Sequence, residues 1–73
     1  MITTRHFEYI GGTSAKFWQV TVAARSVSIR YGRIGTNGQS QTKSFQSEAE
    51  AQRFAEKQCS AKAAKGYLEL VPS

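Results

Sequence analysis

The 73-residue sequence contains no aspartate, one histidine and one cysteine. With Cys59 alone, no disulfide can form within the chain, which fits a reducing compartment. A metal site needs more imidazole or thiolate ligands than one His6 and one Cys59 can provide. A Cys–His catalytic pair would also lack an aspartate to orient the imidazole. We therefore expect no catalytic residue, no metal, no cofactor and no small-molecule substrate.

Long apolar segments are missing as well. No run approaches the roughly 18 apolar residues of a membrane-spanning helix. The first ten residues include Arg5, His6 and Glu8 in place of the apolar core of a signal peptide. No internal repeat or low-complexity segment is visible. The length and these absences predict a single domain over residues 1–73, located in the cytoplasm and without a membrane partner.

Positive charge is the main compositional feature that is present. Ten lysines and arginines stand against five glutamates, which gives a net charge of +5 and an isoelectric point near 9.8. This density of positive charge on a small domain favours a polyanionic partner such as nucleic acid. The plain alternative is a cationic domain without such a partner, because net charge alone is a weak predictor of function.

The first 46 residues have the alternation of apolar and polar side chains that is typical of strands. We predict strands at Thr4–Ile10, Lys16–Val22, Val27–Gly32 and Gln39–Gln46. In the second strand Trp18, Val20 and Val22 share one face, which we expect to meet the core. Asn37-Gly38 is a strong hairpin signal between the third and fourth strands. The fourth strand is polar except for Phe45 and is expected at an edge.

The period changes to that of a helix after residue 46. Ser47 and Glu50 have the spacing of a capping box, and Gly66 stands where a C-terminal cap belongs. Ala51, Phe54 and Ala55 form the expected buried stripe. Tyr67–Val71 is predicted to be a final short strand. Since the strands lack the long connections that parallel pairing requires, we predict an α+β fold, with one helix packed on one face of an antiparallel sheet of four to five strands.

The segment Tyr31–Gln39 combines an aromatic side chain, a cation and three glycines in nine residues. An aromatic face can stack on a base or sugar, and the Arg33 guanidinium can fork onto a phosphate or a carboxylate. The strand alternation puts Tyr31 on the same face as Val27 and Ile29. Either Tyr31 packs against the core, or the strand twists out of register at Gly32 and exposes it.

These motifs resemble the WGR domain family, which is named for a Trp-Gly-Arg triplet and occurs in poly(ADP-ribose) polymerases and in small bacterial proteins. The similarity covers residues 16–67 and includes several motifs in the same order. The matching segments are Lys16-Phe17-Trp18, Tyr31–Gln39, Lys43 with Phe45, the helix start at Ser47, and Lys62–Tyr67. Tyr31 stands at the position of the family's tryptophan.

The resemblance implies a binding function without catalysis. In the polymerases this domain binds DNA, especially broken ends, and a separate domain performs ADP-ribosyl transfer. A DNA partner, or RNA, is therefore implied. Tyr31 would stack on the sugar and base at the end of a nucleic-acid strand, and Arg33 takes the place of the family's arginine. The charge of the chain supplies the other candidates. The predicted nucleic-acid-binding residues are Tyr31, Arg33, Arg30, Lys43, Lys62 and Lys65.

A second function stays open, namely a protein-interaction module. In the polymerases the domain also contacts neighbouring domains, and in this second function Arg33 and the glycine-rich turn would contact an acidic or ADP-ribosyl-bearing partner protein. Lys62 and Lys65 have a simpler role too, because cations in the last turn complement the helix dipole. The two functions differ in what an Arg33→Ala substitution should abolish, either binding of DNA or binding of a partner protein.

Overall fold

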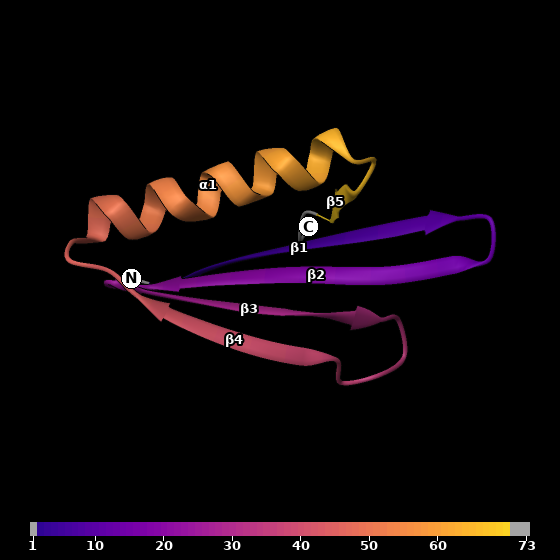
Figure 1. The fold of residues 1–73 in the computed structure, drawn as a ribbon, viewed down its shortest axis with the longest axis horizontal. Coiled ribbons are helices and arrows are strands. Elements are labelled where there is room, and N and C mark those ends of the chain that lie inside the picture. The colour runs from indigo at the N-terminus through magenta and orange to yellow at the C-terminus, as the bar shows by residue number, and fades with distance from the viewer. Residues whose placement is uncertain (1, 71–73) are drawn as a thin grey trace.

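The fold is a sheet covered on one face by a helix. The computed structural model describes residues 2–70, in which five strands form one antiparallel sheet and one helix lies across it (Figure 1). The elements are β1 Ile2–Gly11, β2 Ser14–Ala23, β3 Ser26–Arg33, β4 Gln39–Ser44, α1 Glu48–Ala64 and β5 Leu68–Leu70. The strand order is β4-β3-β2-β1-β5, so α1 carries the chain from one edge of the sheet to the other. The predicted α+β architecture is confirmed.

The predicted elements are confirmed, with differences at their ends. β1, β2 and β3 each extend one or two residues beyond the predicted ranges at both ends. β4 ends earlier than predicted, at Ser44, and Phe45 leaves the strand so that its ring packs against Phe54 of α1, with a centroid separation of 5.1 Å. The last strand begins at Leu68, one residue later than predicted, and Val71 lies outside the described residues. Within residues 2–70, no helix has the length and apolar character needed to cross a membrane.

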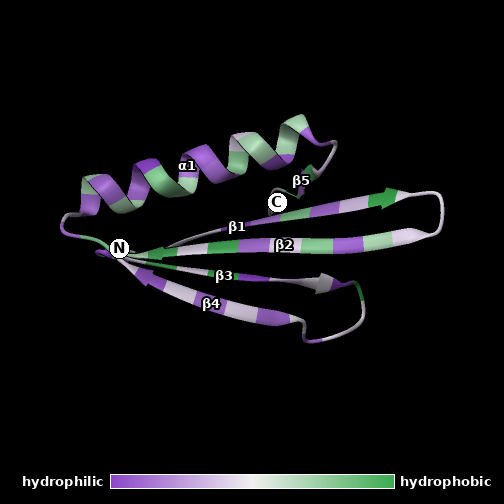
Figure 2. Cartoon of the chain, in the orientation of Figure 1, coloured by the Kyte–Doolittle hydropathy of each residue, from purple (hydrophilic) through white to green (hydrophobic). Residues whose placement is uncertain are grey.

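The core lies between α1 and the central strands. Trp18, Val20 and Val22 are all buried there, as the alternation in β2 predicts. On α1 the buried positions are four residues apart, at Ala51, Ala55 and Cys59, and their small side chains let the helix lie close to the sheet. Figure 2 shows the resulting alternation of apolar and polar residues along β2 and β3. The full core cluster is Phe7, Trp18, Val20, Val22, Val27, Ala51, Ala55 and Cys59.

Phe17 is buried on the face of the sheet that α1 does not cover. Only 6% of it is exposed, although it points away from the core as its place in β2 predicts. The Arg30 guanidinium lies 5.1 Å from its ring centroid, and the His6 ring stacks beside it at 6.0 Å. The turn after β3 covers the remaining part of the Phe17 ring. Gly38 in this turn lies so close that a Cβ there would be 2.8 Å from Cζ of Phe17. The alternation of polarity alone gave no signal for this second buried aromatic.

The close packing of this turn explains two of the glycines in the Tyr31–Gln39 segment. A Cβ on Gly32 would be 2.7 Å from Cα of Gly38, so the two backbones meet directly. A Cβ on Gly38 would overlap the carbonyl oxygen of Tyr31, and Gly38 has a φ of +69°. Side chains at either position would force the turn off β3. These glycines therefore shape the turn that follows the candidate binding residues.

Candidate nucleic-acid interface

A groove opens between the second half of α1 and the sheet. Its volume is about 330 Å³, and aromatic, lysine and amide side chains share its walls. Within residues 2–70, no carboxylate lines it. The lining residues are Lys16, Phe17, Trp18, Ile29, Tyr31, Gly32, Gln41, Gln58, Lys62 and Tyr67. The groove thus offers flat apolar surface, amide hydrogen-bonding groups and positive charge together.

The end of α1 places Lys62 at this groove. The helix begins at an N-cap, where the Ser47 hydroxyl accepts from the Glu50 amide at 3.2 Å, which confirms that half of the capping box. At the other end Gly66 has a φ of +99°, and the amide of Tyr67 donates to the carbonyl of Lys62 at 3.1 Å. This Schellman motif turns the chain back and brings the Tyr67 ring beside the Lys62 side chain.

The Lys62 ammonium is held between two aromatic rings. Its Nζ lies 5.3 Å from the centroid of Tyr67 and 5.6 Å from that of Trp18. The side chain is half-buried. Burial lowers the pKa of Lys62 most, and the charges of Lys65 and Lys16 lower it further. Three lysines therefore converge from β2 and the end of α1.

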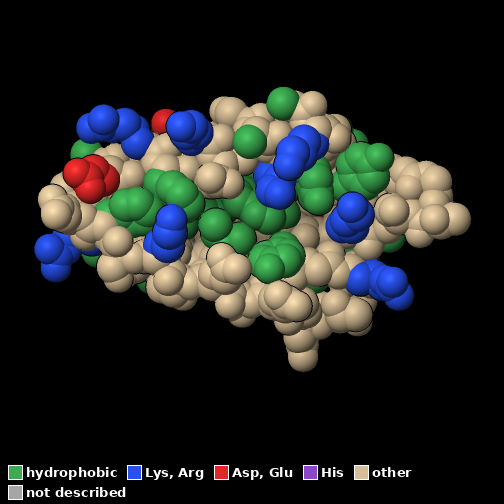
Figure 3. Space-filling view, in the orientation of Figure 1, with side chains coloured by type: hydrophobic (Ala, Val, Ile, Leu, Met, Phe, Trp, Pro, Cys, Tyr) green, Lys and Arg blue, Asp and Glu red, His purple; other side chains and the backbone are tan. Residues whose placement is uncertain are grey.

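Arg33 joins these lysines through the pairing of β2 with β3. It lies opposite Lys16 in the register, and cross-strand partners project from the same face of a sheet. Figure 3 shows basic side chains around the end of α1 and the adjacent strand ends with no acidic side chain among them in this view, whereas around the start of α1 basic and acidic side chains lie together. We call Lys16, Arg33, Lys62 and Lys65 the basic cluster. Within the described residues, no ion pair to a carboxylate neutralises any of the four.

Tyr31 packs against the core, which is the first of the two alternatives that the sequence left open. β3 stays in register with β2 through Arg33, and Tyr31 pairs with Trp18 across the strands. Its ring is half-buried and lines the groove, and its hydroxyl donates to Oε1 of Gln39 at 3.1 Å. Because this part of the core borders the groove, packing against the core and facing a ligand do not exclude each other here.

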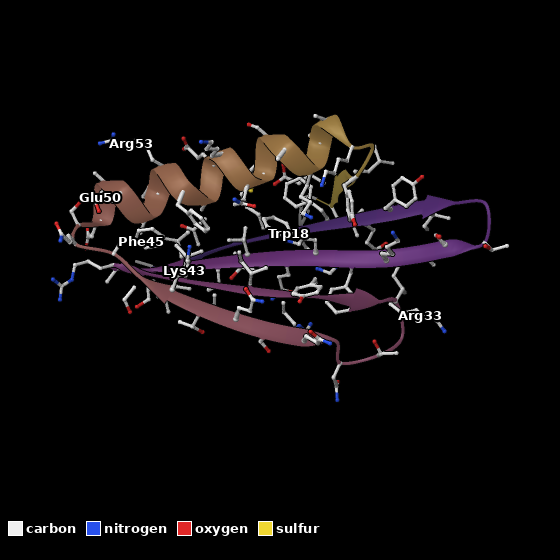
Figure 4. All side chains as sticks on the ribbon, viewed as in Figure 1. Trp18, Arg33, Lys43, Phe45, Glu50 and Arg53 are labelled. Atoms are coloured by element: carbon white, nitrogen blue, oxygen red, sulfur yellow. The ribbon has the colours of Figure 1, made fainter. Side chains whose placement is uncertain are left out.

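Four of the predicted binding residues do not line the groove, since only Tyr31 and Lys62 are among its lining residues. Arg33 and Lys65 belong to the basic cluster, whereas Arg30 and Lys43 lie elsewhere. Arg30 projects from the uncovered face of the sheet, over Phe17, because it is one residue out of phase with Tyr31. Lys43 is on the helix side, but its Nζ lies 5.1 Å from the Phe54 ring near the start of α1. Figure 4 shows Lys43 and Arg33 toward opposite ends of the sheet.

Eight of the ten groove residues are absent from the predicted binding set, although Lys16, Trp18 and Tyr67 belong to the motifs of the family resemblance. Trp18, Gln41, Gln58 and Tyr67 come from two strands, the helix and the turn after it, so no local pattern joins them. Lys16 could have been found, because the hairpin register between the second and third strands places it opposite Arg33. Predicting the pairing of the strands would therefore have added Lys16 to the binding residues expected from sequence.

The fold and the ordered motifs are those of a known domain family. The WGR domain model matches residues 1–72, and the chain belongs to the WGR domain family. A crystal structure of a protein from Bacteroides fragilis superposes with a TM-score of 0.91 at 39% sequence identity, covering 94% of this chain and 20% of that chain. Both the sequence and the tertiary arrangement are therefore shared.

Two curated proteins of Escherichia coli K12 are similar to the chain over 65 residues. The uncharacterized protein YfeS is 37% identical, and protein YehF is 42% identical. The match covers 89% of this chain in both cases, but 27% of YfeS and 24% of YehF. The chain thus spans about a quarter of the length of the curated relatives that it matches.

Proposed function

We propose that the protein is a nucleic-acid-binding module, which agrees with its family, and that the groove and the basic cluster are its binding surface. The observation that carries the proposal is the surroundings of Lys62. This half-buried cation has Lys65 and Lys16 close enough to lower its pKa, and within residues 2–70 no carboxylate lines its groove. Like charges held together at such a site are an electrostatic cost, and phosphate groups would relieve it.

The remaining groups suit a nucleotide chain. The Tyr31 ring lines the groove and gives a flat surface for a base or sugar, and stacking of this kind contributes about 1–3 kcal/mol per base. The exposed Arg33 guanidinium can make a bidentate contact with a phosphate. By the resemblance to the polymerase domains, we propose a DNA end or strand break as the preferred ligand. The WGR domain is a non-catalytic module, so binding alone is proposed.

Fluorescence anisotropy tests this function directly. A blunt 5′-phosphorylated duplex, a closed hairpin and a single strand are titrated with the protein between 50 and 300 mM salt. Four phosphate contacts by the basic cluster should give a slope of log affinity against log salt of about −3.6 on duplex DNA. A flat salt response would contradict nucleic-acid binding, and equal affinity for all three ligands would contradict the preference for ends.

A second candidate function is contact with another protein segment through Arg33 and its turn. It is supported by the lengths of the relatives, since the matched region is about a quarter of YfeS and of YehF. In those proteins the domain therefore has other segments beside it. An Arg33→Ala variant that keeps full DNA affinity but loses a partner in a pull-down would decide for this function.

A further inference from the structure

Lys62 differs from every other lysine in the chain. Its side chain is half-buried, whereas the other four are exposed. Its amine lies over the faces of Trp18 and Tyr67, which fix it at the wall of the groove. Within residues 2–70, it forms no ion pair with a carboxylate. The exposed lysines are Lys16, Lys43, Lys57 and Lys65.

These surroundings favour nucleophilic reactivity of the amine. An amine attacks an acyl group only in its unprotonated form, and a desolvated lysine near other cations holds its proton less tightly. Burial, followed by the charges of Lys65 and Lys16, lowers the pKa of Lys62, so more of it is neutral near pH 7 than of an ordinary lysine. The two rings attract the protonated form, which opposes this lowering, but they also hold the side chain at the wall of the groove.

The same neighbours select a class of acyl donor. Lys16 lines the same groove as Lys62, the charges of Lys16 and Lys65 both act on Lys62, and Arg33 lies across from Lys16 in the sheet. Cations gathered around a nucleophile would bind a phosphate group and stabilise it as it leaves. An acyl phosphate is a small anion in which the carbonyl carbon is joined directly to such a phosphate.

We propose that Lys62 is a site of acylation by small acyl phosphates such as acetyl phosphate. Neutral Nζ attacks the carbonyl carbon, the bond from that carbon to the phosphate oxygen breaks, and inorganic phosphate leaves with the electron pair. The proton lost by Nζ goes to the phosphate or to solvent, and the products are an amide and inorganic phosphate. The reaction requires no oxidant or reductant. It replaces a cation of the groove with a neutral amide and would therefore weaken binding of any anionic ligand there.

The test measures acetylation of each lysine by peptide mass spectrometry after incubation with millimolar acetyl phosphate at neutral pH. Lys57 is the internal control, because it is exposed on the same helix and does not line the groove. We expect Lys62 to be acetylated several-fold faster than Lys57. Equal or slower acetylation of Lys62 would overturn the proposal.

A second acyl donor separates phosphate selection from general reactivity. N-hydroxysuccinimide acetate carries no phosphate, so with it the preference for Lys62 over Lys57 should be smaller. Lys16→Gln, a change at an exposed position, should lower the preference more with acetyl phosphate than with the ester, and added inorganic phosphate should slow only the acetyl phosphate reaction. An identical preference with both donors would overturn the role of the cations. No nucleic acid is present in these measurements, so they stand apart from the proposed function.

Discussion

The two faces of the sheet carry their charges in different ways. On the helix side, the cations of the basic cluster lie close to one another around the groove. On the uncovered face, hydroxyl groups run across the strands, with hydrogen bonds between Thr4 and Thr21 at 3.1 Å and between Ser28 and Thr42 at 3.2 Å. The cation Arg30 lies beside this row and stacks on Phe17. The location of an anion-binding site therefore depends on which cations the pairing of strands brings together, more than on the number of cations in the chain.

The largest expected effect contrasts the buried aromatics of β2. Trp18 belongs to the core under α1, and Phe17 lies on the other face beneath the turn after β3. We expect Trp18→Ala to lower the free energy of unfolding by about 3–5 kcal/mol, because α1 cannot collapse into the space. Phe17→Ala should cost less than this range, since a surface turn can settle over the gap. Urea denaturation of both variants measures the difference, and an equal loss would contradict the contrast between the faces.

Gly38→Ala should give the next largest loss of stability. The substitution puts a Cβ at a φ of +69° and against the Tyr31 carbonyl and the Phe17 ring. We expect a loss of about 1–3 kcal/mol in the free energy of unfolding. Gly12→Ala is the matched control, because Gly12 has a φ of +58° but no atom within 4 Å of the added Cβ. If the control loses as much stability as Gly38→Ala, then glycine is required at position 38 by its backbone conformation and not by close packing.

The fold could be predicted from sequence because its signals are local. Alternation in β2, the Asn37-Gly38 hairpin, the Ser47 cap and Gly66 each act over a few residues, and they all agree with the structure. The groove is different. Tyr31 and Lys62 are separated by 31 positions and meet only because α1 returns across the sheet. The family resemblance supplied Tyr31 and Arg33. The strand alternation already places Arg30, which was chosen for its charge, on the opposite face from Tyr31, and the structure agrees.

A pair of charge-removing variants tests the two faces as binding surfaces. Lys62→Gln removes a cation from the groove, and Arg30→Gln removes one from the uncovered face. We expect Lys62→Gln to weaken DNA binding and to reduce the magnitude of the salt slope by about 0.9, which corresponds to one phosphate contact. Arg30→Gln should leave both quantities unchanged in the same anisotropy titration. The opposite result would move the interface to the uncovered face.

The smallest expected effect concerns Arg5, whose positive charge is balanced by an ion pair with Glu69. Arg5 donates to both carboxylate oxygens of Glu69, from Nε at 2.8 Å and from Nη2 at 2.7 Å. The hydrogen bond from Arg5 lowers the pKa of Glu69, so its stabilising contribution is present above the ordinary pKa of 4.5 and is lost as the pH falls through the lower value in the folded protein. Since both side chains are partly exposed, we expect Glu69→Gln to cost only about 0.2–1 kcal/mol at pH 7.

Urea denaturation between pH 2.5 and 7 measures this effect in the original chain, in Glu69→Gln and in Arg5→Gln. The two variants should lose similar stability at pH 7 and converge with the original chain at the acid end, because protonated Glu69 no longer attracts Arg5. Neither variant should change the salt slope of DNA binding, since the paired Arg5 lies outside the basic cluster. A reduced slope in Arg5→Gln would instead mean that this cation leaves Glu69 to bind phosphate, and the groove would then extend along β1.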